Sequence, residues 1–288
     1  APKPGGSTPS EPFGGILKQA QLPLDVRVAQ LNAKGRALLP NNQIVVFELK
    51  GGGIQTGQSG KVEWVVDFAD STAGAALRGL RSTGTATVRI ASDRRIDSVE
   101  VETVAAATGP NLPPDRVQVS AKAAAPTAGG NESYAATVAL LRGNNVEPLV
   151  RTNAQFLAAS REIAGTWELG VRSEQLAALL TGLGLPQVAA NGTGKFNLKP
   201  DTNTVAASGD FQAEASKLEQ VAPALAAIGT ARINLSFDAG LDAGETAQLQ
   251  KLELTATDGA GRRFAQITAV QRISYGLTSK KVTFANAS

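Results

Sequence analysis

The chain has 288 residues, of which 42% are hydrophobic and 18% are charged, and its formal net charge is +3. This apolar fraction can supply a substantial buried surface, so the composition excludes a chain that is disordered throughout. His, Cys and Met are absent. Without imidazoles or thiols, the sequence excludes disulfides, the usual serine-hydrolase triad and the common zinc, copper, haem and iron–sulfur sites.

The first residues are rich in Pro, Gly and Ser, and we expect a flexible segment over residues 1–20. The remainder, residues 21–288, is expected to form one antiparallel β region. Because the sequence lacks an initiating Met and a charged-then-apolar leader, we expect a processed protein or an excerpt from a longer one. No window reaches about 18 consecutive apolar residues, so we expect any membrane anchor to lie outside this sequence.

Residues 61–68 show the clearest strand pattern in the chain. Apolar side chains occupy every second position, charged side chains occupy most of the others, and Val65 is the exception. This period of two is typical of a strand with one dry face and one wet face. The pattern recurs along the chain and predicts roughly fourteen strands. Later examples lie at residues 117–121, 134–140, 167–171, 195–198, 233–237 and 252–254.

Turns and loops are predicted from composition and from breaks in the alternation. Residues 85–90 and 98–103 are expected to form a hairpin whose turn is Ser92–Arg94, with a bulge near Ile96, which has the wrong parity. Gly51–Gly53 is expected to be a flexible turn between strands. Other expected irregular stretches are residues 105–115 and 123–133, which are predicted to be loops, and residues 142–148, a candidate boundary for a subdivision of the β region.

Two segments have helical spacing. In the first, expected over Ser173–Leu183, Ser173 can cap a helix whose leucines recur at helical intervals, and Gly184 followed by Pro186 closes it. The second is expected over Ser216–Ile228. It starts with a capping box but contains Pro223, which predicts a kink or two short turns.

No motif in the sequence supports catalysis or cofactor binding. In Gly57–Gly60 the second glycine comes one residue too early for a nucleophile elbow, and a strand follows where a helix is required. Gly194 and Lys195 lead into a strand without a following Ser or Thr, which favours a hairpin glycine over a phosphate loop. Asp and Glu alternate outward on strands, so solvated faces explain them better than a glycosidase pair or a calcium site. We therefore expect no enzyme, no cofactor and no metal.

The composition also argues against a nucleic-acid partner. Neither sign of charge forms a block of five or more residues, and aromatic residues make up only 5% of the chain. They are not interleaved with clustered Lys and Arg as in single-strand binding surfaces. We expect no nucleic-acid partner.

The apolar side chains of the alternating strands are expected to point to a common interior. A register that buried the opposite face would desolvate charged residues such as Glu63 and Glu168. Two alternatives remain at this point: a closed sandwich that hides this face between two sheets, and an open groove that a lipid or a partner covers. The predicted lining residues are Val62, Trp64, Val66, Phe68, Ala86, Val88, Ile90, Val99, Val101, Trp167, Leu169, Phe196, Leu198, Ile233, Leu235 and Phe237.

The second half of the chain carries a recognisable order of motifs. A strand with Trp167–Leu169 precedes the Leu-rich segment that ends at Pro186, and Gly192–Leu198 and Ser208–Phe211 follow. In this order, and in the residue 22–26 entry to the alternating strands, the chain resembles the AsmA-like and TamB-like family. The resemblance is clearest from about residue 165 to residue 238.

The resemblance implies an elongated, curved antiparallel sheet that forms an open groove, a β-taco, with two short helices. It also implies a periplasmic location in the cell envelope of a Gram-negative bacterium and a role in lipid transport and outer membrane biogenesis. Phospholipid acyl chains would run along the apolar lining, inner- and outer-membrane proteins would be partners through flanking segments, and no catalytic residues carry over. The alternative is a structural or adhesive envelope protein whose closed β-sandwich holds no lipid.

Overall fold

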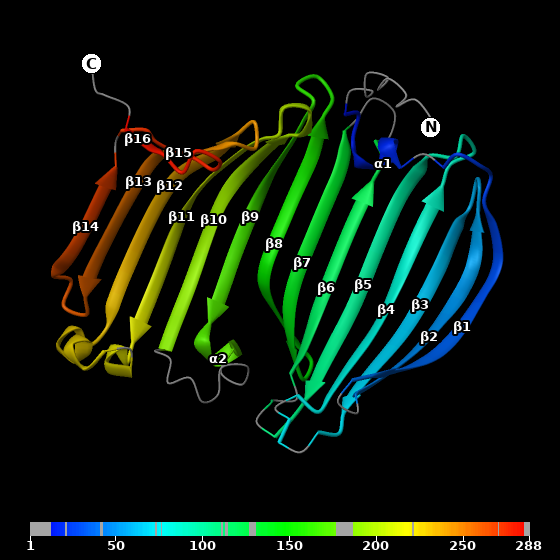
Figure 1. Cartoon of the computed structure of the whole chain (residues 1–288), viewed down its shortest axis with the longest axis horizontal. Helices are drawn as coiled ribbons and strands as arrows, with labels where there is room; N and C mark the ends of the chain where they lie inside the picture. Colours follow the sequence, from blue (N-terminus) through cyan, green and yellow to red (C-terminus); the bar gives the residue numbers. More distant parts are fainter. Residues whose placement is uncertain are drawn as a thin grey trace.

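The structure is a computed structural model that describes residues 13–284 apart from 21, 41–42, 73, 76, 111, 113–114, 127–130, 177–186, 221 and 270. These residues form one 16-stranded antiparallel sheet (Figure 1). The first eight strands are β1 (Arg27–Leu39), β2 (Gln43–Gln55), β3 (Ser59–Asp70), β4 (Gly79–Ile90), β5 (Ile96–Thr108), β6 (Arg116–Ala124), β7 (Glu132–Arg142) and β8 (Asn145–Leu157). The others are β9 (Glu162–Arg172), β10 (Gln187–Lys199), β11 (Thr204–Ser216), β12 (Ala231–Asp242), β13 (Thr246–Asp258), β14 (Arg263–Ala269), β15 (Ile273–Gly276) and β16 (Val282–Phe284).

The strand order follows the chain, because each strand from β1 to β13 pairs with the next one. Beyond β13 the edge is shared: β14 pairs with one part of β13 and β15 with another, and β16 pairs with β15. The sheet is open and visibly curved (Figure 1). The prediction of an open, curved antiparallel sheet is therefore confirmed. Among the described residues there is no second sheet, so the closed sandwich does not match this architecture.

The helices are short and lie at the ends of the strands. α1 (Ile16–Gln19) lies at the end of the sheet that carries the β4–β5 turn, and α2 (Ser173–Leu176) lies at the opposite end (Figure 1). α2 begins at the predicted residue, whereas residues 177–183 of the predicted helix lie outside the described part. The second predicted helix is two 3₁₀ helices, η2 (Leu218–Gln220) and η3 (Pro223–Ile228), as the internal proline indicated. A further 3₁₀ turn, η1, covers Pro200–Thr202.

The predicted hairpin is present between β4 and β5. Its turn is closed by the Arg94 N–H, which donates to the Ala91 carbonyl at 3.0 Å, and Arg94 itself has a positive φ of 68°. The register shifts between Arg89 and Ile90, so Ile90 pairs with Ile96. The predicted bulge is confirmed at this place.

Several loop predictions are wrong in part because small residues lie inside long strands. Gly51–Gly53 lies within β2, where Gly52 and Gly53 take φ values of 146° and 67° that other residues rarely adopt. The turn falls later, at Gly57. β5 continues through residues 105–108 and β6 through residues 123–124, because cross-strand pairing outweighs the low strand propensity of Ala. Residues 142–148 contain the turn between β7 and β8, which pair with each other in the same sheet.

The core is thin, as expected for a single layer of strands. Among the described residues no large side chain is fully buried. Several of the most buried apolar side chains gather where α1 covers the sheet, namely Leu17, Phe156 and Ile163. The expected flexible segment of residues 1–20 thus contains a docked part, residues 13–20, while residues 1–12 lie outside the described part.

Candidate functional site: the apolar face of the sheet

The strand register places the predicted lining residues on one face. In antiparallel neighbours, directly paired residues point to the same side of the sheet, and side chains alternate along each strand. One row of paired positions crosses from β1 to β14 and is almost entirely apolar. It consists of Ala33, Leu49, Trp64, Gly84, Thr103, Val119, Val138, Val150, Leu169, Gly192, Phe211, Leu235, Leu254 and Ile267.

A second apolar row runs beside the first. It consists of Leu31, Gly51, Val62, Ala86, Val101, Ala121, Ala136, Thr152, Trp167, Gly194, Gly209, Phe237, Leu252 and Ala269. The other predicted lining residues share this face by pairing or by alternation. They are Val66 and Phe68 of β3, Val88 and Ile90 of β4, Val99 of β5, Phe196 and Leu198 of β10, and Ile233 of β12. The face that contains both rows is called the apolar face below.

Sequence reasoning missed many members of the apolar face. Phe47 and Leu49 of β2 alternate with Glu48 and Lys50, so the period-two signal that identified β3 was available there as well. On β6 and β7 the signal is weaker, because Ala occupies positions on both faces. Register rather than local pattern assigns those alanines to a side.

The opposite face is polar across the same strands. One row of paired positions from β1 to β14 contains no apolar residue: Asn32, Lys50, Glu63, Thr85, Glu102, Ser120, Thr137, Arg151, Glu168, Thr193, Asp210, Ser236, Glu253 and Thr268. Exposed ion pairs lie on this face, such as Arg81 with Asp67 at 3.3 Å and Lys61 with Glu63 at 2.8 Å. The Lys61 ammonium, through its hydrogen bond, holds the pKa of Glu63 below its usual range. This face is therefore suited to contact with water.

Large rings cover glycines on the apolar face. Trp167 of β9 lies over Gly194 of β10 and Gly209 of β11, where an added Cβ would overlap the indole ring. The ring reaches Phe237 of β12 and stacks on it, with centroids 6.3 Å apart and planes at 22°. Further pairs of this kind join Trp64 with Gly84, Phe211 with Gly192, Phe196 with Gly165 and Phe47 with Gly35.

This arrangement corrects the interpretation of Gly194 as a hairpin glycine. Gly194 lies in the middle of β10, and its missing side chain leaves room for the ring of Trp167. Five of the neighbouring rings thus fill the space that these glycines leave on the apolar face, at Gly35, Gly84, Gly165, Gly192 and the Gly194–Gly209 pair.

Polar groups on the apolar face are few. The hydroxyls of Ser82 and Thr103 are 3.1 Å apart, and the Thr103 hydroxyl donates to the Thr83 carbonyl at 3.2 Å. Charged residues of this face, such as Asp70 and Glu132, occupy the ends of their strands. Between the strand ends the face offers neither a charge nor a converging set of donors.

A cavity of about 360 Å³ lies on the apolar face beside α1. Ile16 of α1 borders it, and the predicted lining residues Val99, Val101 and Phe196 form part of its wall. The remaining wall comes from Ala121, Lys122, Ala123, Tyr134, Ala135, Ala136, Thr152, Ala154 and Ile163. Sequence reasoning had therefore identified part of the wall of this cavity.

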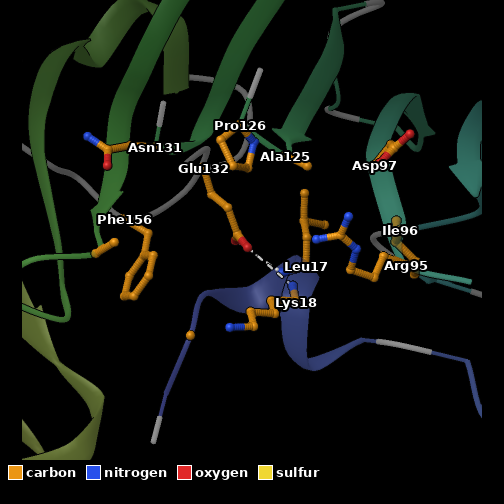
Figure 2. Close-up of a pocket in the computed structure, with 12 residues that line it drawn as sticks. Leu17, Lys18, Arg95, Ile96, Asp97, Ala125, Pro126, Asn131, Glu132 and Phe156 are labelled. Atoms are coloured by element: carbon orange, nitrogen blue, oxygen red, sulfur yellow. Dashed lines mark hydrogen bonds between the residues drawn. The ribbon is translucent and has the colours of Figure 1, made fainter. Parts of the chain in front are cut away.

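A smaller pocket lies on the outer side of α1 at the end of the sheet (Figure 2). Here the Glu132 carboxylate points toward α1 and accepts the backbone N–H of Leu17 at 3.1 Å and that of Lys18 at 3.2 Å. The Tyr134 hydroxyl donates to the same carboxylate. Burial, with this hydrogen bond, raises the pKa of Tyr134 above its ordinary value, so the phenol stays protonated and remains a donor.

Within the described ranges, no group of three or more His, Cys, Asp and Glu residues is placed to hold a metal ion. None of the helices described is long and apolar enough to cross a membrane. No family model, curated protein or solved structure matches the chain.

Proposed function

We propose that this chain is a non-catalytic, AsmA-like cell-envelope protein whose apolar β-groove carries or shields phospholipid acyl chains between the inner and outer membranes. The single observation that carries the proposal is the apolar face, which runs from β1 to β14 with no second layer among the described residues to bury it. Val119 and Ile267 of this face are 38% and 53% exposed. An apolar surface of this extent calls for a ligand or a partner to cover it.

The chemistry of the face suits hydrocarbon chains better than most other ligands. An acyl chain has no hydrogen-bonding groups, and the apolar face between the strand ends presents almost only carbon. Each methylene that moves from water to this face contributes about 0.8 kcal/mol, so ten of them contribute roughly 8 kcal/mol before the entropy of ordering is subtracted. A polar ligand would gain little there, because no set of donors or acceptors converges on one point.

The charged strand ends suit the polar head group of a phospholipid. Asp70, for example, stands at a rim of the face, where a head group would meet water. A lining with no fixed polar partner selects for the tails and tolerates different head groups. We therefore propose phospholipids in general as the cargo, with membrane proteins of both membranes as the partners that load and unload them.

A structural or adhesive envelope protein is the second candidate. Its closed-sandwich form does not match the open sheet, so this candidate now requires a partner protein to cover the apolar face. The two candidates differ in what contacts the face in cells: acyl chains in the first, protein side chains in the second.

A photo-crosslinking amino acid at Val88 or Arg89 separates these candidates. The two positions are adjacent in β4, yet Val88 belongs to the apolar face and Arg89 points to the polar one. In Gram-negative cells that express the chain, we expect phospholipid adducts at Val88 and none at Arg89. Native mass spectrometry of the purified protein should show bound phospholipid. Protein adducts in place of lipid at Val88, Val101 and Leu235 would favour the structural protein.

A further inference from the structure

The N-terminal segment, defined here as residues 13–19, lies on the apolar face. The Phe13 ring meets the Phe156 ring edge to face, with centroids 5.4 Å apart and planes at 84°. Phe156 belongs to the apolar face, since it pairs with Ile163 and stands two residues from Ala154. Leu17 is only 4% exposed, and Ile16 borders the cavity described above. The segment therefore presents three apolar side chains to the surface that we assign to acyl chains.

Polar contacts hold the segment at one end of the sheet. Glu132 accepts the N–H groups of Leu17 and Lys18, and the Tyr134 hydroxyl accepts the Ile16 N–H at 3.2 Å. Gly15 has a φ of 110°, and a Cβ there would overlap the Glu132 carboxylate, so the glycine allows this close approach. Farther out, the Phe13 N–H donates to the Asp201 carboxylate at 2.9 Å. These contacts define one docked position for the segment.

The same contacts are few enough to be reversible. α1 is a single turn, too short to be stable without its contacts, and no residue of the segment belongs to a strand of the sheet. Ile16 remains 50% exposed although it stands over the cavity. Loss of three side chains and a few hydrogen bonds at one rim would leave the pairing of all sixteen strands unchanged.

We propose that the N-terminal segment is a displaceable plug that occupies one end of the apolar groove until a phospholipid acyl chain replaces it. This inference rests on the proposed function, and it adds regulation of the same site. Phe13 covers Phe156, Leu17 lies beside it, and Ile16 borders the cavity that Val99 and Val101 line, so an acyl chain that ran along Phe156 would have to displace the segment. The cavity beside Ile16 gives the end of an entering chain a first apolar contact.

Competition of this kind has a measurable consequence. A ligand that binds only the open form has its apparent affinity reduced by the fraction of molecules that are open, so a plug docked nine-tenths of the time weakens binding about tenfold. By linkage, saturating lipid should undock the plug. The two effects can be measured independently, one on the lipid and one on the segment.

The test uses the full chain and a fluorescent phospholipid with one labelled acyl chain. Leu17→Asp should expel the plug, because it places a charge at a buried position, and Phe13→Ala with Ile16→Ala should loosen it without a new charge. Leu24→Asp is the matched control, since Leu24 is 72% exposed in the connection to β1. We expect both plug variants to bind the lipid about tenfold more tightly than the control, which should match the wild type.

The position of the plug is read by trypsin cleavage after Lys18, followed by intact mass. Cleavage in the wild type should accelerate when unlabelled phospholipid is added, whereas Leu17→Asp should be cleaved rapidly with or without lipid. Lipid binding that is equal in all variants, with cleavage at Lys18 unaffected by lipid, would overturn the plug and leave the proposed function intact. Absence of lipid binding in every variant would overturn both. Circular dichroism confirms that each variant keeps its strands.

Discussion

Two regions of the apolar face achieve continuity in different ways. Across β3–β5 it is made mainly of aliphatic side chains such as Val62, Val88 and Val101, and only Trp64 lies over a glycine there. Across β9–β12 large rings lie over glycines, and Trp167 spans two strands to reach Phe237. The first region distributes its stability over many small contacts. The second concentrates it in a few rings whose positions depend on the register of several strands.

Trp167→Ala should have the largest effect on stability. The change uncovers Gly194 and Gly209 and removes the stack on Phe237, so we expect the free energy of unfolding to fall by about 3 kcal/mol. In the other region, Val101→Ala should cost only about 1.5 kcal/mol. Urea denaturation monitored by far-ultraviolet circular dichroism gives both values. Equal losses would mean that the two regions do not differ in the way described.

Gly194→Ala should have the next largest effect on stability. Its Cβ would overlap the Trp167 ring and the Ser208 carbonyl oxygen, and we expect a loss of about 2 kcal/mol from this overpacking. Gly170 of β9 is the matched control, because its nearest neighbour to a new Cβ is the Pro148 carbonyl oxygen at 4.0 Å. Gly170→Ala should be neutral or slightly stabilising. A destabilised Gly170→Ala would show that strand glycines are needed for a reason other than ring packing.

Val88→Asp sharpens the distinction between an open and a closed apolar face. In the open sheet the new carboxylate can reach water, so we expect about 1 kcal/mol of destabilisation together with loss of acyl-chain binding. In a closed core the buried charge would cost about 3 kcal/mol or more. Thr87→Asp, on the polar face of the same strand, should leave lipid binding unchanged. Retained lipid binding in Val88→Asp would contradict the assignment of this face.

Asp258→Asn, at the end of β13, should have the smallest effect on stability. The Asp258 carboxylate accepts the N–H groups of Ala260 and Arg262 at 2.9 Å, and the Arg262 bond is the main cause that holds the pKa of Asp258 below its usual range. A depressed folded-state pKa contributes stability that is present above the unfolded pKa and is lost as pH falls through the folded one. Melting temperature should therefore fall less between pH 5 and about 3 in Asp258→Asn than in the wild type. Glu245→Gln serves as the exposed control. If the melting temperature of Asp258→Asn fell as steeply with pH as that of the wild type, the Asp258 carboxylate would not stabilise the fold in this way.

The strands with strong alternation were predictable, and so was the side on which their residues lie. Val62, Trp64, Val66 and Phe68 alternate with polar neighbours, and the structure places them together because a strand has a side-chain period of two. Strands rich in Ala and Gly were mistaken in part for loops. Their membership of the sheet depends on partners such as Leu80, which pairs with Ala107, and a partner on another strand leaves no mark on the local pattern.

The sequence by itself determined an antiparallel β architecture, one apolar and one polar face, and the lack of His, Cys and Met chemistry, because composition and the period of two are local properties. Tertiary structure decided that the sheet stays a single open layer, that Gly194 packs under Trp167, and that Glu132 docks α1 on the apolar face. These features join residues that are tens to more than a hundred positions apart. Only the accumulated register and curvature of the sheet bring them together.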